Sequence, residues 1–132
     1  SEDERRVARM ENESVNFDTD VERPTDGPLA FMFNDMAQNE HLRESSDLAA
    51  TIQARLKRSL PGPSRGVKQG GLVVLSTAYM PAVLVEIGYG TNRVDADWMS
   101  SAAGQDEVAE ALAGAALEYL ARRERRVPGG GK

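Results

Sequence analysis

Apolar residues recur at helical spacing through the first half of the chain. Between residues 28 and 36 they fall at positions i, i+3, i+4 and i+7, which predicts one apolar stripe along a helix. A second stretch, residues 48–56, repeats apolar residues at every fourth position and ends before the Pro-Gly-Pro breaker at 61–63. The pattern leaves open whether residues 28–60 form one helix or two helices broken near residues 39–46.

Further helices are predicted in both halves of the chain. Ser1 stands where it can cap the first of them, and acidic residues follow it in the first turn. These predicted helices are residues 1–13, 93–100 and 105–123. Residues 14–27 show no periodicity and are expected to form a long loop, whereas the Gly-rich residues 127–132 have the composition of a tail or linker.

Two short runs are apolar at consecutive positions, residues 72–75 and residues 82–87. Such runs suit strands that are buried on both faces, and with the flanking helices they predict an α/β fold. Two strands cannot build a sheet with both faces covered. We therefore expect residues 1–126 to be part of one α/β domain. Further strands of its sheet are expected to lie before Ser1 and to be missing from this chain.

The charge of the chain is divided unevenly between its two parts. Residues 1–47 hold thirteen Asp and Glu against five Lys and Arg, whereas residues 48–132 hold eight against eleven, for a net charge of −5. An acidic first part argues against nucleic-acid binding, which needs a clustered basic face. The arginine cluster at residues 122–126 suits a helix C-terminus, where cations offset the helix dipole. No apolar run approaches the ~20 residues that span a bilayer.

Glu86 is the chemical outlier of the sequence. It interrupts the apolar run 82–87 directly before Gly88, and open α/β sheets place ligand chemistry at such carboxyl ends of strands. A carboxylate buried there needs compensation by a metal ion, a substrate donor or a basic side chain. The pattern alone leaves a catalytic carboxylate and a structural ion pair equally open.

His41 is the only histidine of the chain, and there is no cysteine. Glu40 and Glu44 could lie near it on a helix, but a catalytic zinc site needs at least three ligands, and no HExxH-type pairing is present. His41 is most simply a solvated surface side chain. This chain alone is therefore not expected to build a zinc site.

Three segments carry motifs of a known family. They contain Ala8-Arg-Met-Glu-Asn12, Asn34-Asp-Met-Ala-Gln-Asn39 and Met80-Pro-Ala-Val-Leu-Val-Glu-Ile-Gly88. Together they resemble the zinc-dependent N-acetylmuramoyl-L-alanine amidases of bacterial cell envelopes. The likeness runs over about residues 1–120 and corresponds to the C-terminal half of the family's catalytic domain. It implies that the sheet is mixed and flanked by helices.

The resemblance implies hydrolysis of the amide between N-acetylmuramic acid and L-alanine of the peptidoglycan stem peptide. It implies a zinc ion held by two histidines and a glutamate that lie before Ser1, so this chain alone is expected to be inactive. For Glu86 it implies the role of catalytic glutamate, which accepts a proton from zinc-activated water and passes it to the leaving amine. It also implies a periplasmic or secreted protein.

Two further expectations depend on the resemblance. Some regulated family members place an inhibitory helix over the zinc, and residues 9–29, with the loop at 14–27, resemble that insertion. Glu11 is then a candidate inhibitory metal ligand, and an activator protein is implied as a partner. The alternative is a non-catalytic envelope protein that keeps the fold to bind a partner or peptidoglycan, but retention of Glu86 favours the enzyme.

Overall fold

The structure of the chain is a computed structural model that describes residues 2–14, 28–76 and 78–126. The chain divides into two compact units. The first comprises Ser1–Ser45 and Lys68–Leu84, and the second comprises Ser46–Val67 and Val85–Lys132. Each unit therefore brings together segments that are far apart in the sequence.

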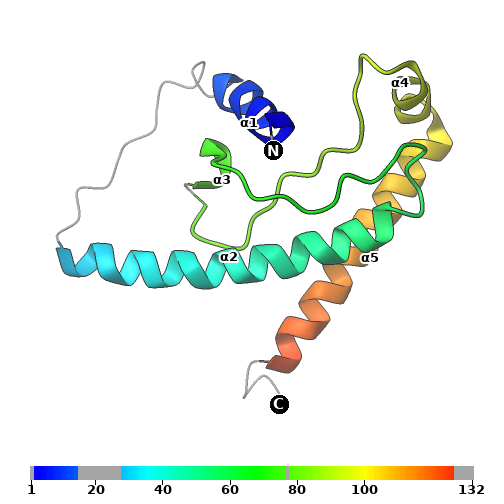
Figure 1. The fold of residues 1–132 in the computed structure, drawn as a ribbon. Coiled ribbons are helices and arrows are strands. Elements are labelled where there is room, and N and C mark those ends of the chain that lie inside the picture. Colours follow the sequence, from blue (N-terminus) through cyan, green and yellow to red (C-terminus); the bar gives the residue numbers. More distant parts are fainter. Residues whose placement is uncertain (1, 15–27, 77, 127–132) are drawn as a thin grey trace. The chain divides into compact units, whose positions relative to one another are not determined.

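Most of the described residues lie in helices (Figure 1). They are α1 (Glu2–Ser14), α2 (Pro28–Leu56), α3 (Val73–Ser76), α4 (Arg93–Met99) and α5 (Ala102–Arg126). The three predicted helices outside α2 are confirmed with small shifts at their ends, and α2 is one unbroken helix rather than two. Every helix within the described part of the chain is too short or too polar to cross a membrane.

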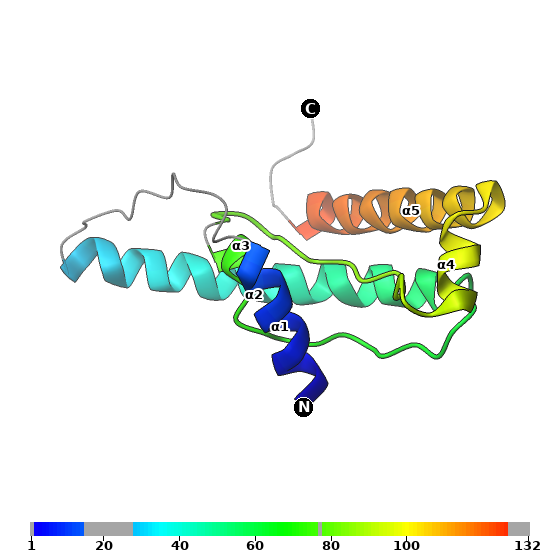
Figure 2. The ribbon, with the colours of Figure 1, turned by 90° about the horizontal axis from the view of Figure 1, so that it is seen from above.

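The predicted α/β fold with a mixed sheet is wrong, because the described residues form helices and no strand. Most of the first apolar run forms the single turn α3. The second run, residues 82–87, has no regular secondary structure and follows an extended path in both views (Figures 1 and 2). A short apolar run cannot by itself distinguish a strand from a helical turn, and a strand also requires a neighbour that pairs with its backbone.

The core of the second unit consists of apolar residues of α2 and α5. The buried hydrophobic residues of each helix recur at every fourth position, which places them on one face. They are Ile52 and Leu56 on α2, and Ala111, Ala115 and Tyr119 on α5. Leu56 is only 3% exposed and Ala115 is fully buried. Because two of the three α5 residues are alanines, little side-chain volume separates the backbone of α5 from its surroundings.

A serine caps α5 where the chain turns out of α4 (Figure 2). The Ser101 hydroxyl oxygen accepts the Gly104 amide at 3.0 Å, and the same hydroxyl donates to the Trp98 carbonyl at 2.7 Å. Gly104 is buried, and a Cβ atom added to it would overlap the Trp98 carbonyl oxygen. Glycine at this position therefore allows α4 and α5 to meet closely.

We expect Gly104→Ala to lower the free energy of unfolding by about 1–3 kcal/mol, because the added methyl group meets a backbone carbonyl that cannot rotate away. Gly114→Ala in the same helix is the matched control. A Cβ atom there would lie 2.5 Å from Arg55 Nη1, the end of a flexible side chain that can move aside. Alanine also favours a helix over glycine by about 1 kcal/mol.

Urea unfolding followed by circular dichroism measures both variants. We expect Gly114→Ala to be as stable as the original chain or more stable. Equal stability of the two variants would contradict the close contact at Gly104.

Candidate functional site

Glu86 lies on the irregular segment between α3 and α4. Exposure alternates along this segment: Val83, Val85 and Ile87 are half-buried, whereas Leu84 and Glu86 are exposed. Such alternation is typical of an extended chain, in which successive side chains point to opposite sides. The Glu86 carboxylate is therefore presented to solvent, while its apolar neighbours point away from it.

The exposure of Glu86 bears on the choice that its sequence context left open. The sequence left a catalytic carboxylate and a structural ion pair equally open, and the structure places Glu86 at an exposed position. A carboxylate open to solvent is accessible to a substrate, so the catalytic role of Glu86 stays a prediction that the geometry allows.

The chain directly after Glu86 is attached to the first turn of α4. The Tyr89 amide donates to Asp95 Oδ2 at 3.0 Å. Asn92 is the N-cap of α4, and its Oδ1 accepts the amides of Val94 at 2.9 Å and Asp95 at 3.2 Å. The first turn of α4 therefore has its amides satisfied by Asn92, which leaves the Asp95 carboxylate available to the preceding segment.

Two glycines and one arginine complete the surroundings of this attachment. A Cβ atom added to Gly88 would lie 3.0 Å from the Asp95 Cβ, and one added to Gly62 would lie 3.5 Å from Asp95 Oδ1. The Arg65 guanidinium lies over the Tyr89 ring, 4.9 Å from its centroid, within the range of a cation–π contact. Tyr89 is thus held through its backbone amide, which bonds to Asp95, and through its ring, which contacts Arg65.

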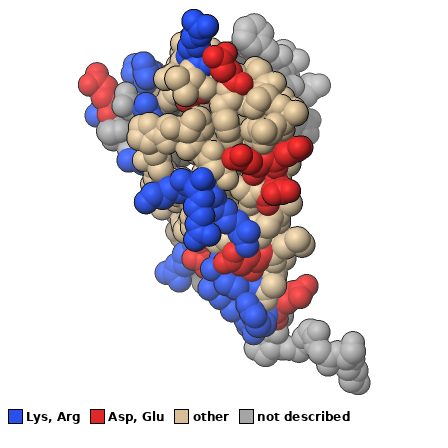
Figure 3. Space-filling view, turned by 90° about the vertical axis from the view of Figure 1, so that its right-hand side faces the viewer, with Lys and Arg blue, Asp and Glu red and all other residues tan. Residues whose placement is uncertain are grey.

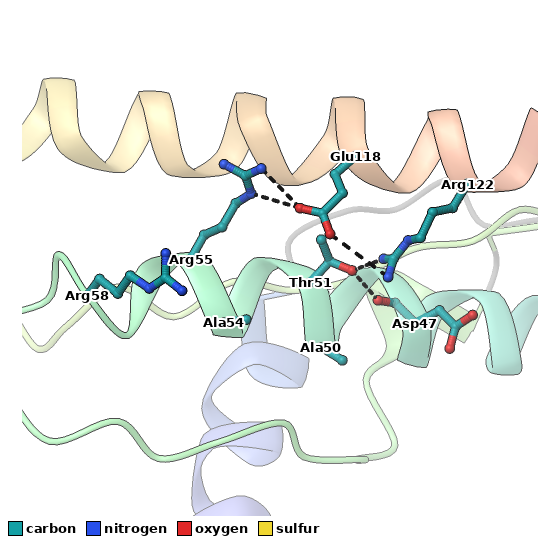
Figure 4. Close-up of a pocket in the computed structure, with 8 residues that line it drawn as sticks. All are labelled: Asp47, Ala50, Thr51, Ala54, Arg55, Arg58, Glu118 and Arg122. Carbon is teal, nitrogen blue, oxygen red and sulfur yellow. Dashed lines mark hydrogen bonds and ion pairs between the residues drawn. The ribbon is translucent and has the colours of Figure 1, made fainter.

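A second candidate is a hollow of about 410 Å³ between α2 and α5 (Figure 4). Six of its eight lining residues are charged or polar. The lining consists of Asp47, Ala50, Thr51, Ala54, Arg55, Arg58, Glu118 and Arg122. Arg55 donates to Glu118 Oε2 through Nε at 3.2 Å and Nη2 at 3.0 Å. Arg122 lies 4.0 Å from Glu118 Oε1 and donates to the Thr51 hydroxyl.

The charged groups of this hollow bond mainly to one another. The buried Thr51 hydroxyl donates to the Asp47 carbonyl at 2.8 Å and accepts from Arg122, so its hydrogen-bonding capacity is used. Arg126 Nη1 lies 2.8 Å from Asp47 Oδ2. Basic and acidic side chains are also interspersed on the face drawn in Figure 3. We therefore interpret the hollow as part of the contact between α2 and α5.

In the first unit, α1 is bonded to the segment before α3 through Asn12. Asn12 Nδ2 donates to the Gly71 carbonyl, and the Val73 amide donates to Asn12 Oδ1, both at 2.8 Å. This pair of bonds copies the way one extended backbone pairs with another. Asn12 thereby fixes the C-terminal part of the helix that carries Glu11.

Glu11, the one candidate metal ligand named from the sequence, lies on α1 and is half-buried. His41, which we predicted to be a solvated side chain, lies on α2 and is also half-buried, so it is less solvated than predicted. Across residues 2–14, 28–76 and 78–126, no group of three or more His, Cys, Asp or Glu side chains could hold a metal ion. The inhibitory role of Glu11 stays a prediction, because residues 15–27 lie outside the described part of the chain.

Sequence reasoning did not identify Asn12, Asn92 or Asp95. A signal existed for two of them, since Asn92-Arg-Val-Asp95 has the form of a helix start, with a cap residue and an acidic residue three positions later. Asn12 has no comparable signal. Its partners lie 59 and 61 residues away in the sequence.

Comparison with known proteins identifies the family to which these features belong. A sequence model of the family described as N-acetylmuramoyl-L-alanine amidase matches residues 14–118 of the chain. The matched region contains Glu86 together with Asn92 and Asp95. The chain therefore belongs to the N-acetylmuramoyl-L-alanine amidase family, and the predicted resemblance is confirmed.

Several curated proteins are similar to the chain. An uncharacterized cell wall amidase of Bacillus anthracis is 38% identical over 81 residues, 61% of this chain and 15% of the relative. The amidase LytC of Bacillus subtilis is 36% identical over 75 residues, 57% of this chain and 15% of the relative. AmiA of Escherichia coli is 29% identical over 86 residues, 65% of this chain and 30% of the relative.

The chain thus spans well under two thirds of the length of these relatives. No solved structure matches it. Family membership consequently rests on sequence, and the arrangement of the helices rests on the structure described above.

We expect Asn12→Ala to detach α1 from residues 71–73, because the change removes both the donor and the acceptor. The Val73 amide then loses its partner, and its hydrogen exchange should become roughly tenfold faster. Exchange followed by mass spectrometry or NMR measures this rate. Glu13→Ala, an exposed position on the same helix, is the control and should leave the rate unchanged. Unchanged exchange at Val73 in Asn12→Ala would disprove the attachment.

Proposed function

We propose that the chain is part of a peptidoglycan amidase that cleaves the bond between N-acetylmuramic acid and L-alanine of the stem peptide. Membership of the amidase family carries this proposal, and the names of LytC and AmiA are consistent with it. The substrate implies that the protein works outside the cytoplasm, at the cell wall. The activator protein expected from the resemblance is part of the same proposal.

Glu86 is the residue to which we assign the catalytic step within this chain. Amide hydrolysis needs a base that removes a proton from the attacking water and an acid that protonates the leaving nitrogen. One carboxylate can do both in turn, provided that it lies within hydrogen-bond reach of each group. The exposure of Glu86 and the attachment of the segment that follows it support this assignment.

The residues of this chain do not by themselves fit a catalytic zinc centre. Such a centre needs at least three protein ligands, whereas the chain has one histidine and no cysteine, and its described residues contain no suitable group. Zinc is therefore proposed for the complete protein only, held by ligands other than the described residues. We assign to this chain the proton transfer by Glu86 and none of the principal zinc ligands, while the inhibitory role of Glu11 stays a separate prediction.

We expect Glu86→Gln in the full-length protein to lower amidase activity roughly 10²- to 10⁴-fold, because glutamine keeps the shape of the side chain but cannot accept the proton. The assay measures soluble material released from purified peptidoglycan and the new L-alanine amino termini. Glu110→Gln, an exposed position on α5, is the matched control and should keep full activity. Full activity in Glu86→Gln would refute the catalytic role.

A second expectation concerns zinc. Calorimetric titration of the 132-residue chain with zinc should give no stoichiometric binding in the micromolar range, because the chain has one histidine and no cysteine, and its described residues contain no group of three possible ligands. The same titration of the full-length protein is the positive control. Stoichiometric micromolar binding by the 132-residue chain, with turnover of peptidoglycan, would overturn the division of roles proposed here.

A further inference from the structure

We propose that Asp95 is a positioning residue for Glu86, an inference that rests on the catalytic role proposed above for Glu86. Asp95 lies nine positions further along the chain, in the first turn of α4. It contacts the backbone that immediately follows Glu86. Three sets of contacts attach the backbone after Glu86 to α4 and α5, and together they restrict the direction of the Glu86 side chain.

The first contact is the hydrogen bond from the Tyr89 amide to Asp95 Oδ2 at 3.0 Å. A hydrogen bond to an ionised acceptor is stronger than one between neutral groups. Only Ile87 and Gly88 separate Tyr89 from Glu86, and each residue has two soft backbone dihedrals because the peptide bond is planar. The bond fixes the peptide plane between Gly88 and Tyr89. Only a few backbone dihedrals then lie between this plane and Glu86, so the Glu86 backbone has less conformational freedom.

The second contact is steric. The Gly88 backbone lies so close to Asp95 that a Cβ atom at this position would be 3.0 Å from the Asp95 Cβ and 3.3 Å from Oδ2. On the other side, a Cβ atom at Gly62 would be 3.5 Å from Oδ1. Each carboxylate oxygen of Asp95 thus lies near a glycine, and at Gly88 the approach is so close that a larger residue would crowd Asp95.

The third set of contacts attaches Asp95 itself. Asn92 caps the helix that carries it, and the Asn92 amide donates to the Tyr89 carbonyl at 2.9 Å. At its other end, α4 joins α5 through the bonds of Ser101 to Trp98 and Gly104. A catalytic group must be held within about 0.5 Å of its productive position. The capped helix α4 can supply that precision through Asp95.

The test compares variants of the full-length protein on a soluble muropeptide substrate. Asp95→Ala removes the acceptor, and we expect kcat to fall roughly 10- to 100-fold because misplaced catalytic groups lose about this much. KM should stay within about twofold, because Asp95 does not bind substrate in this proposal. Asp95→Asn keeps an acceptor oxygen and should restore kcat to within about threefold of the original protein.

Asp97→Ala is the matched control on the same helix. Its side chain is 76% exposed and pairs with Arg93 in the adjacent turn, at 3.7 Å. We expect kcat and KM to be unchanged in this variant. Loss of kcat in Asp97→Ala equal to that in Asp95→Ala would show a general weakening of α4 and would overturn the positioning role.

The outcomes separate this inference from the proposed function. If Glu86→Gln is inactive while Asp95→Ala keeps its kcat, the positioning role is wrong and the catalytic role stands. If Glu86→Gln is fully active, both are wrong. If Asp95→Ala loses its helical circular dichroism, the Gly88→Ala variant replaces it as the test. The added methyl group should displace the backbone after Glu86 from Asp95 while Asp95 itself stays intact. A folded Gly88→Ala enzyme with lowered kcat supports positioning, and one with normal kcat overturns it.

Discussion

The hydrogen bond from the Tyr89 amide to the Asp95 carboxylate joins the segment that carries Glu86 to the helices of the second unit. Its importance follows from what surrounds it. Residues 78–92 have no regular secondary structure, so no ladder of backbone bonds fixes their path. In such a segment, side-chain acceptors and close backbone contacts determine where each residue points. The position proposed for the Glu86 carboxylate therefore depends on α4, a helix of seven residues.

The helices that support this attachment are stabilised by two kinds of contact between α2 and α5. The Arg55 and Glu118 side chains are 42% and 45% exposed, and such ion pairs contribute about 0–1 kcal/mol each. Burial of Leu56 and Tyr119 contributes more, since full burial of a large apolar side chain stabilises by about 1.5–3 kcal/mol. Apolar contacts thus provide the stability of the helix pair, while the charged groups around Thr51 fix its orientation.

The sequence predicted the parts of the structure that depend on local pattern. The helices follow from apolar spacing within each segment, and Asn92 with Asp95 has a local signature that could have been read as a helix start. The predicted strands were wrong, because a strand depends on a pairing partner that apolar residues at 72–75 and 82–87 do not specify. The same limit applies to Asn12, whose bonds to Gly71 and Val73 cross some sixty positions. Glu86 was singled out by its chemistry, as a carboxylate within an apolar run.

The exposure of Glu86 bears on how the catalytic role proposed for it would work. Enzymes obtain efficient proton transfer from an exposed carboxylate by holding it against the substrate and excluding water. Within the described residues, Asp95 can supply the first of these requirements by holding the backbone after Glu86. Exclusion of water needs a surface that covers Glu86, which the substrate or other parts of the complete protein would provide. Positioning can therefore be assigned to this chain, whereas the full activity belongs to the assembled site.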